Sequence, residues 1–312
     1  MNRIALALLA ASAALFAGAA EAQQSPAPPA APFIDWDKIQ IKTTDLGNNT
    51  YMLEGQGGNI TIAVGNDGIL MVDGQFAPLS DKIKAAIKAI SPLPIKYMIN
   101  THYHGDHTGG NEVFGREAPI IATENARKRL ASGTTVHGEK IPPAPKGALP
   151  VLTFNDRATI HINGEEVRMM KVANAHTDGD AIIEFTGSGV IHMGDVFFNG
   201  TFPFIDSENG GTLRGTIKVV ESVLATMDKD VKVIPGHGPL GDKPVLEGYR
   251  DALKGTVAIM NEAIQKGKTL EQVKKEKTLV AWEHLASDFV TLDAYEEMLY
   301  KELTASAPAP AK

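Results

Sequence analysis

The sequence contains no cysteine among its 312 residues. Disulfide bonds, cysteine-ligated zinc sites and thiol nucleophiles are therefore excluded, and any metal site must use histidine, aspartate or glutamate. A basic excess is also missing, because 37 acidic residues outnumber 30 basic ones and the net charge is −7. This balance argues against a nucleic-acid-binding protein, so we expect no nucleic acid among its partners.

Long apolar runs are scarce as well. The run over residues 4–17 is short and rich in alanine for a bilayer span, which needs about 20 strongly apolar residues. A basic residue precedes this run and an A-x-A motif follows it at 20–22, so residues 1–22 are predicted to be a cleaved signal peptide. We therefore expect a periplasmic or secreted protein whose mature chain has no membrane span.

Proline and alanine dominate both flanks of the predicted folded region. Residues 23–32 form a Pro/Ala linker, and residues 305–312 have the same character and predict a disordered tail. The chain as a whole is 43% hydrophobic and 21% charged, which is ordinary for a globular protein. Residues 33–304 are therefore predicted to fold as one domain.

Hydrophobic periodicity indicates short strands alternating with helices. The predicted helices cover 78–90, 124–131, 212–227, 245–265, 270–277 and 292–303, and the predicted strands cover 51–54, 59–64, 68–72, 95–100, 120–122, 158–162, 165–171, 181–185, 190–193 and 231–234. Asn163-Gly164 between two of these strands predicts a type I′ hairpin turn. Because strands are followed by a helix in each half, we expect two mixed sheets packed face to face with helices outside. Periodicity indicates this mixed α/β class and no particular strand order.

The strongest chemical signal follows the predicted strand that ends at Asn100. Four potential ligands, His102, His104, Asp106 and His107, fall within six residues of an HxHxDH segment. In extended or turn backbone the first two histidines project to the same side, because side chains alternate. Such a cluster at a strand end is typical of a metal site. Three histidines and a carboxylate suit zinc, and can also suit iron or manganese.

Three further residues follow β-rich runs in the same way. His176 lies in NAHTDGD, Asp195 in MGDVFF and His237 in PGHG, each in a glycine-containing turn after a predicted strand. An aspartate in such a place is often only a turn or helix-cap residue. Together with the HxHxDH segment, however, the set is larger than one metal ion uses, so we expect a binuclear site.

These motifs resemble those of the metallo-β-lactamase superfamily. The likeness extends over nearly the whole folded region and rests on Asp73 in LMVDGQ, the HxHxDH segment at 102–107, His176, Asp195 and His237. The resemblance implies a four-layer αββα sandwich in a single domain, with the metal ions at one edge between the sheets.

The resemblance also implies a role for each residue and two zinc ions per chain. One ion would be held by His102, His104 and His176. The second would be held by Asp106, His107 and His237, with Asp195 bridging the two. Asp73 would not touch metal but would hydrogen-bond within the ligand loop. Metal-bound hydroxide would attack a carbonyl or phosphoryl group, with Asp106 also orienting the nucleophile as the catalytic residue.

Departures from the family pattern narrow the expected substrate. The commonest zinc β-lactamases carry a cysteine where this chain has Asp195, and shortly afterwards a lysine that residues 196–199 lack. An aspartate at this position instead resembles the pattern of glyoxalase II, lactonases and other general hydrolases of the superfamily. We therefore expect a hydrolase of small-molecule β-lactam, lactone, ester or thioester bonds. The alternatives left open are a phosphodiesterase or nuclease of the same superfamily and a mononuclear-iron sulfur dioxygenase.

Four residues are candidates for substrate contact. Tyr103 lies between two expected ligands, and Phe198 belongs to an aromatic group that could form an apolar wall. Asn209 and Arg214 could contact a carboxylate or oxyanion. For the two aromatic residues, packing inside the domain is the structural alternative. The Pro-rich residues 134–150 predict a loop with little regular structure, long enough to be a flap.

Overall fold

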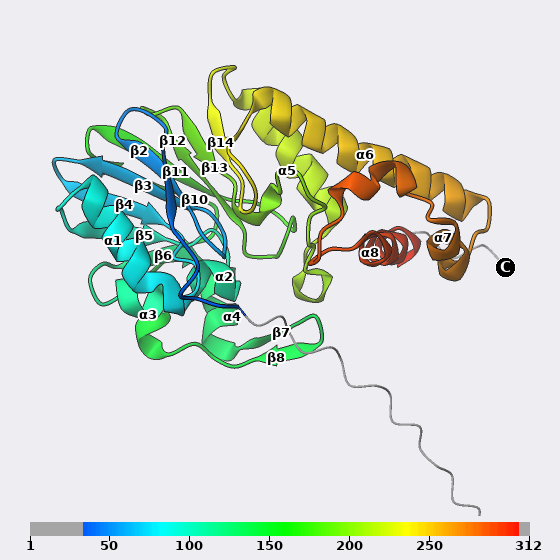
Figure 1. The fold of residues 1–312 in the computed structure, drawn as a ribbon, viewed down its shortest axis with the longest axis horizontal. Coiled ribbons are helices and arrows are strands. Elements are labelled where there is room, and N and C mark those ends of the chain that lie inside the picture. Colours follow the sequence, from blue (N-terminus) through cyan, green and yellow to red (C-terminus); the bar gives the residue numbers. More distant parts are fainter. Residues whose placement is uncertain (1–33, 306–312) are drawn as a thin grey trace, which may run out of the picture. The chain divides into compact units, whose positions relative to one another are not determined.

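Two β-sheets face each other in the computed structural model, which describes residues 34–305. The expected signal peptide at 1–22 and the linker at 23–32 lie outside the described residues, as does the expected tail at 305–312 except for Ala305, which ends a helix. Helices cover the outer face of each sheet, so residues 36–305 form one domain with four αββα layers (Figure 1). The expected mixed α/β sandwich is confirmed.

The first sheet is built from the N-terminal half of the domain. Its strands lie in the order β1-β2-β3-β4-β5-β6-β9. Their bounds are β1 Lys42–Asp45, β2 Thr50–Glu54, β3 Ile60–Gly65, β4 Gly68–Val72, β5 Ile95–Ile99, β6 Ile120–Thr123 and β9 Leu152–Phe154. Strands β1 to β4 pair antiparallel, whereas β4, β5, β6 and β9 pair in parallel.

The second sheet follows in the order β10-β11-β12-β13-β14-β15. Its strands are β10 Arg157–Ile162, β11 Glu165–Lys171, β12 Ala181–Phe185, β13 Val190–His192, β14 Lys232–Ile234 and β15 Gly241–Asp242. Only β13 and β14 pair in parallel. Asn163 and Gly164 join β10 to β11 with φ of 57° and 75°, and this pair of positive angles is what the expected type I′ turn requires.

Helices fill the two outer layers and the connections. The α-helices are α1 Ser80–Ile90, α2 Gly105–Thr108, α3 Asn111–Phe114, α4 Glu124–Ser132, α5 Leu213–Thr226, α6 Lys243–Gln265, α7 Leu270–Glu276 and α8 Leu292–Ala305. The 3₁₀ turns are η1 Ala77–Leu79, η2 Lys146–Ala148, η3 Gly194–Val196, η4 Ser207–Asn209 and η5 Val280–Leu285. Thr212 and Asp242 cap the N-termini of α5 and α6 through their side chains. Within residues 34–305, no helix is both long and apolar enough to cross a membrane.

Residues 134–150 correct one expectation from the sequence. Instead of an irregular loop, β7 Thr134–Val136 and β8 Glu139–Ile141 form a hairpin, and η2 follows it. The hairpin turns at His137 and Gly138, which both have positive φ. Strands of three residues show too little alternation to be recognised, and histidine is not a usual turn residue, so the local pattern carried no hairpin signal.

Strand β4 shows how the layers are held together. All five of its residues are buried. Leu70 and Val72 pack in the core between the two sheets, whereas Ile69 and Met71 point the other way and pack in a second core with Ile83 of α1. The strand is apolar on both faces because one face meets the other sheet and the other meets a helix.

Candidate metal centre

Loops that follow strands of both sheets meet at one edge of the sandwich. Asp73 follows β4, the HxHxDH segment follows β5, His176 lies between β11 and β12, Asp195 follows β13, and His237 follows β14. Because β4 and β5 are parallel, and β13 and β14 are parallel, each pair delivers its loops to one end of its sheet. The fold therefore brings together the seven side chains that the sequence suggested as ligands.

Three imidazole rings converge on one point. His104 Nδ1 lies 3.1 Å from Nε2 of His102 and 2.8 Å from Nε2 of His176. The Oδ2 atom of Asp195 lies 3.5 Å from Nε2 of His176. All four side chains are buried, and one donor atom from each lies within 4.8 Å of the others. This first group could hold a metal ion.

A second group lies beside the first and is partly open. Asp106 Oδ2 lies 3.1 Å from His237 Nε2 and 3.6 Å from His107 Nε2. The Oδ1 atom of Asp195 lies 3.0 Å from Nε2 of His107 and 3.5 Å from Nε2 of His237. The Asp195 carboxylate thus faces one group with each oxygen. The side chains of Asp106 and His237 are 26% and 30% exposed, so solvent reaches the centre from their side.

The hydrogen bonds behind the first group show that a cation fits there. His176 Nδ1 lies 2.8 Å from the backbone oxygen of Phe204, and His104 Nε2 lies 2.9 Å from Oδ2 of Asp206. Carbonyl and carboxylate oxygens only accept hydrogen bonds, so these ring nitrogens donate. In neutral rings the opposite nitrogens then carry lone pairs, and these face each other at 2.8 Å. Such lone pairs repel unless a cation lies between them.

The second group contains buried polar atoms that lack a partner. Asp73 Oδ2 accepts from His107 Nδ1 at 2.8 Å, and the same carboxylate holds the backbone N–H of Thr101 at 2.8 Å. His107 Nε2 and Asp195 Oδ1 are buried, and neither has a hydrogen-bond partner among the described residues. A buried polar atom without a partner costs about 1–3 kcal/mol, and a metal ion between these two atoms would remove that cost.

Burial and neighbouring carboxylates shift the pKa values of the two groups in different directions. Burial lowers the pKa of His176 to about 4, which leaves the ring neutral, as a metal ligand must be. Burial also acts on His237, but Asp195 and Asp106 outweigh it and raise its pKa to about 9. Burial opposes ionisation of Asp106, yet His107 and His237 bring its pKa to about 2. The second group therefore favours positive charge, which a proton or a metal cation can supply.

Glycine permits close approach of backbone to the ligands at two places. A Cβ atom at Gly58, in the loop between β2 and β3, would lie 2.0 Å from Cε1 of His107. A Cβ atom at Gly236 would lie 2.0 Å from Oδ1 of Asp195. Any side chain at either position would displace the neighbouring ligand, so the geometry of the centre requires glycine there.

Asp206 was not among the residues expected from the sequence. Its carboxylate accepts a hydrogen bond from His104, another from the Tyr103 hydroxyl, and two from the Asn209 amide at 2.8 Å. Burial opposes its ionisation, but the bonds from His104 and Tyr103 hold the pKa of Asp206 below its ordinary value. Asp206 lies in an irregular stretch with no motif and no strand before it, so no local signal marked it.

The four candidates for substrate contact lie in different places. The side chains of Tyr103 and Asn209 are buried and bound to Asp206, behind the ligands. The Phe198 ring stacks on that of His237 with centroids 5.2 Å apart. Arg214 is exposed on the first turn of α5 and lines a neighbouring cavity. Phe198 is itself 4% exposed and packs in the core of the domain, so of its two expected roles the structure places it in packing.

Comparison with known families gives one match over most of the chain. Residues 44–254 match the family described as the metallo-beta-lactamase superfamily. This range contains all seven expected ligands and ends within α6, so α7 and α8 follow it.

Curated relatives are distant. Over 256 residues the chain is 25% identical to a linear primary-alkylsulfatase of Pseudomonas sp., a match covering 67% of this chain and 48% of that protein. Over 112 residues it is 28% identical to a hydroxyacylglutathione hydrolase of Prochlorococcus marinus, covering 35% of this chain and 38% of that protein. The chain thus spans about half the length of the alkylsulfatase and 38% of the length of the hydroxyacylglutathione hydrolase.

Solved structures share the fold at low identity. A metallo-beta-lactamase from Pontibacter korlensis superposes with a TM-score of 0.59 and 18% identity, covering 69% of this chain and 99% of that one. A stereoselective inverting sec-alkylsulfatase from Pseudomonas sp. superposes with a TM-score of 0.63 and 15% identity, covering 86% of this chain and 51% of that one. At these identities the likeness shows a common fold.

Proposed function

Because this chain belongs to the metallo-β-lactamase superfamily, we propose that it is a hydrolase with two zinc ions that cleaves a carbonyl compound. The observation that carries this proposal is the Asp195 carboxylate, which faces one donor group with each of its oxygens. Such a shared ligand is what a two-ion centre needs. The bonds considered are those of β-lactams, lactones, esters and thioesters.

The donor set suggests which residues would hold the ions. His102, His104 and His176 would hold one ion. Asp106, His107 and His237 would hold the other, and Asp195 would bridge. Two bound zinc ions supply acidity to a coordinated water and positive charge to the group under attack. The all-nitrogen and oxygen donor set also accommodates iron or manganese, so the identity of the metal is part of the test.

The open side of the centre supports a role for Asp106 in catalysis. Asp106 and His237 are the partly exposed ligands, so water and substrate arrive beside them. The free oxygen of Asp106 can accept a hydrogen bond from an attacking water and so orient it. Phe198 is buried and supports the ring of His237 by stacking on it.

A metal and substrate panel tests the proposal. The protein is stripped with a chelator, reloaded with zinc, and assayed on a cephalosporin, a lactone, p-nitrophenyl acetate and a thioester. We expect elemental analysis to find two zinc ions per chain. We also expect hydrolysis of at least one substrate, and this hydrolysis should stop when a chelator removes the metal. A single bound iron with oxygen consumption on a persulfide would contradict the proposal. So would a fully zinc-loaded protein that hydrolyses none of these compounds.

One comparison favours sulfate-ester hydrolysis as a second candidate. The alkylsulfatase structure covers 86% of this chain, whereas the metallo-beta-lactamase structure covers 69%. The likeness to the alkylsulfatase thus takes in more of the chain. Adding p-nitrophenyl sulfate to the panel separates the two candidates, because turnover of the sulfate ester without turnover of any acyl substrate selects the second.

Asp206→Ala is expected to weaken metal binding by about 10–100-fold, because it removes the carboxylate that orients His104. Zinc affinity is measured by competition with a chromophoric chelator, and circular dichroism checks the fold. Glu208→Ala, an exposed neighbour in the same loop, serves as the control. Wild-type zinc affinity in a folded Asp206→Ala protein would show that Asp206 does not position His104.

A further inference from the structure

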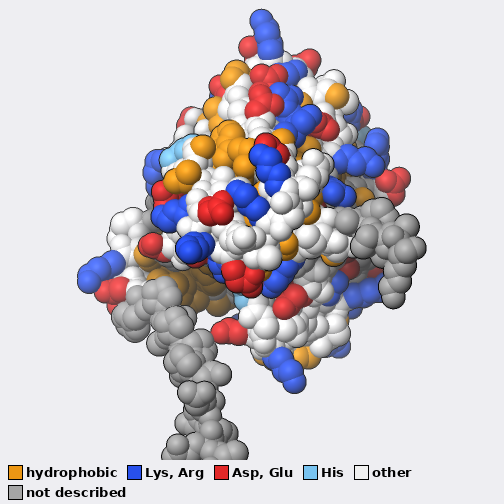
Figure 2. Space-filling view, turned by 90° about the vertical axis from the view of Figure 1, so that its right-hand side faces the viewer, with side chains coloured by type: hydrophobic (Ala, Val, Ile, Leu, Met, Phe, Trp, Pro, Cys, Tyr) orange, Lys and Arg blue, Asp and Glu red, His pale blue; other side chains and the backbone are white. Residues whose placement is uncertain are grey.

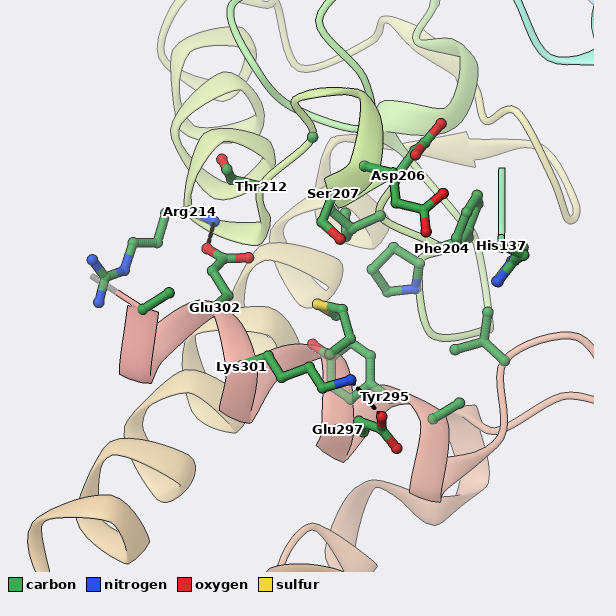
Figure 3. Close-up of a pocket in the computed structure, with 18 of the residues that line it drawn as sticks. His137, Phe204, Asp206, Ser207, Thr212, Arg214, Tyr295, Glu297, Lys301 and Glu302 are labelled. Carbon is green, nitrogen blue, oxygen red and sulfur yellow. Dashed lines mark hydrogen bonds and ion pairs between the residues drawn. The ribbon is translucent and has the colours of Figure 1, made fainter. Parts of the chain in front are cut away.

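A cavity of about 930 Å³ lies next to the candidate metal centre (Figure 3). It is enclosed by the loop of residues 203–212 on one side and α8 on the other, with the tip of the β7–β8 hairpin at one end. Phe204 and Asp206 line that end, and they are the residues that bind His176 and His104 from behind. The cavity and the metal centre therefore share one wall.

The middle of the cavity is apolar. Ile205, Val290, Tyr295 and Met298 line it, and Tyr295 is anchored by stacking on Phe202 with centroids 4.0 Å apart. On the face of the molecule seen in Figure 2, hydrophobic side chains likewise line a hollow. A cavity with a mainly apolar lining is typical of a ligand site.

The charged groups around the cavity are largely paired. Lys301 forms an ion pair with Glu297 at 2.6 Å, and Glu302 accepts the backbone N–H of Leu213 at 2.7 Å, which caps α5. Arg214 also lines the cavity, at the end far from Phe204 (Figure 3). The interior thus offers apolar contact rather than a charged partner, so it suits an uncharged, apolar group.

Three aromatic rings line the end of the cavity nearest the metal centre. His137 stacks on Phe204 with centroids 4.3 Å apart, and Phe289 lies edge-on to Phe204 at 5.6 Å. Phe204 in turn lies 5.6 Å from the ring of His176. Phe289 is 65% exposed, so its ring is accessible from solvent. Phe204 therefore contacts a ring of the candidate metal centre and also lines the cavity.

The wall formed by α8 lies outside the part of the chain that matches the family. The match ends at residue 254, whereas Phe289, Val290, Tyr295 and Met298 follow it. One wall of the cavity is therefore built by residues that follow the matched range, and the other lies within it. A wall added beside a shared centre is a means of selecting substrates without changing the chemistry.

We propose that this cavity binds the apolar part of the substrate, an alkyl chain or ring, while the scissile polar group lies at the metal centre. The inference rests on the proposed hydrolase function. It assigns the substrate class as amphipathic acyl compounds rather than small, fully polar ones. A volume of about 930 Å³ is at the upper end of ordinary ligand pockets, so a chain of several carbons fits.

A series of p-nitrophenyl esters from acetate to octanoate tests the inference in the zinc-loaded, full-length protein. Burial of each added methylene is worth about a fourfold gain in kcat/KM, so octanoate is expected to exceed acetate by at least about 100-fold. Ala294→Trp fills the cavity from an exposed position on α8 and is expected to lower this ratio at least tenfold. Ala258→Trp, an exposed alanine on α6 away from the cavity, controls for the substitution itself.

A binding measurement without catalysis separates this inference from the proposed function. The metal-free protein is titrated with 1-anilinonaphthalene-8-sulfonate, and octanoate but not acetate is expected to displace the dye. Loss of octanoate binding in Ala294→Trp but not in Ala258→Trp supports the cavity assignment. If this loss is seen but no ester is hydrolysed, only the acyl hydrolase function fails. Equal octanoate-to-acetate ratios in wild type and Ala294→Trp, with active enzyme, overturn the inference and leave the function standing.

Discussion

Asp106→Ala is expected to lower kcat for the preferred substrate by about a thousandfold while the protein still folds. Asp106 is the one partly exposed carboxylate among the seven expected ligands, and its Oδ2 lies 3.1 Å from His237. Its removal would take away a proposed ligand of the second ion and the group proposed to orient the attacking water, and a group of the latter kind is worth about 10²–10⁴ in rate. The side chain is 26% exposed, so its removal should lower the free energy of unfolding less than removal of the buried Asp195 does.

The measurement is steady-state kinetics on the zinc-loaded variant, with thermal unfolding run in parallel. Asp106→Asn distinguishes the effect of lost negative charge on kcat from the effect of lost side-chain volume, because the amide keeps the size of the side chain but removes its charge. His161→Ala is the matched control, since His161 is exposed on β10 in the second sheet and should leave kcat and the unfolding temperature unchanged. A near-normal rate in Asp106→Ala would show that the role assigned to Asp106 is wrong.

Asp195→Ala is expected to weaken binding of both metal ions, by at least about 100-fold, whereas His237→Ala weakens only one. The reason is the position of the carboxylate, whose Oδ2 faces His176 and whose Oδ1 faces His107 and His237. If Asp195 is a ligand of both ions, as proposed, its loss should exceed the 10–100-fold effect that an outer partner of a ligand produces.

The same variant should also be less stable without metal. Burial opposes a charge on His107, but Asp195 and its neighbours raise the pKa of that ring well above its ordinary value. Removing Asp195 leaves this buried charge less compensated, which costs about 3 kcal/mol. Zinc stoichiometry by elemental analysis, chelator competition and urea unfolding of the metal-free protein measure these effects. If Asp195→Ala keeps two zinc ions at wild-type affinity, a bridging role is excluded.

Residues that directly follow strands were predictable from local pattern. The HxHxDH segment comes straight after β5, and Asp195 and His237 come within a few residues of β13 and β14. A strand ends where its apolar alternation stops, so the positions of such residues at a sheet edge can be inferred without knowing the strand order. The Asn163-Gly164 turn was predictable for a similar reason, because both residues tolerate the positive φ that a two-residue hairpin needs.

Residues whose role depends on distant partners were not predictable in this way. Asp206 lies 102 positions from His104 along the chain, yet the two side chains meet at 2.9 Å. The His137–Phe204–Phe289 ring group joins three segments that carry no common motif. The β7–β8 hairpin was missed because its strands are too short to show a period.

The amino-acid sequence was sufficient to infer the metal-binding chemistry, because ligand type is a property of the side chain and a strand end is a local feature. It excluded cysteine ligands, supplied seven oxygen and nitrogen donors, and indicated a mixed α/β sandwich. Folding alone placed Asp195 between the two donor groups, Asp206 behind His104, and α8 across a cavity beside the centre. These arrangements arise from the packing of elements far apart in the chain, and no local pattern of residues encodes a distance between them.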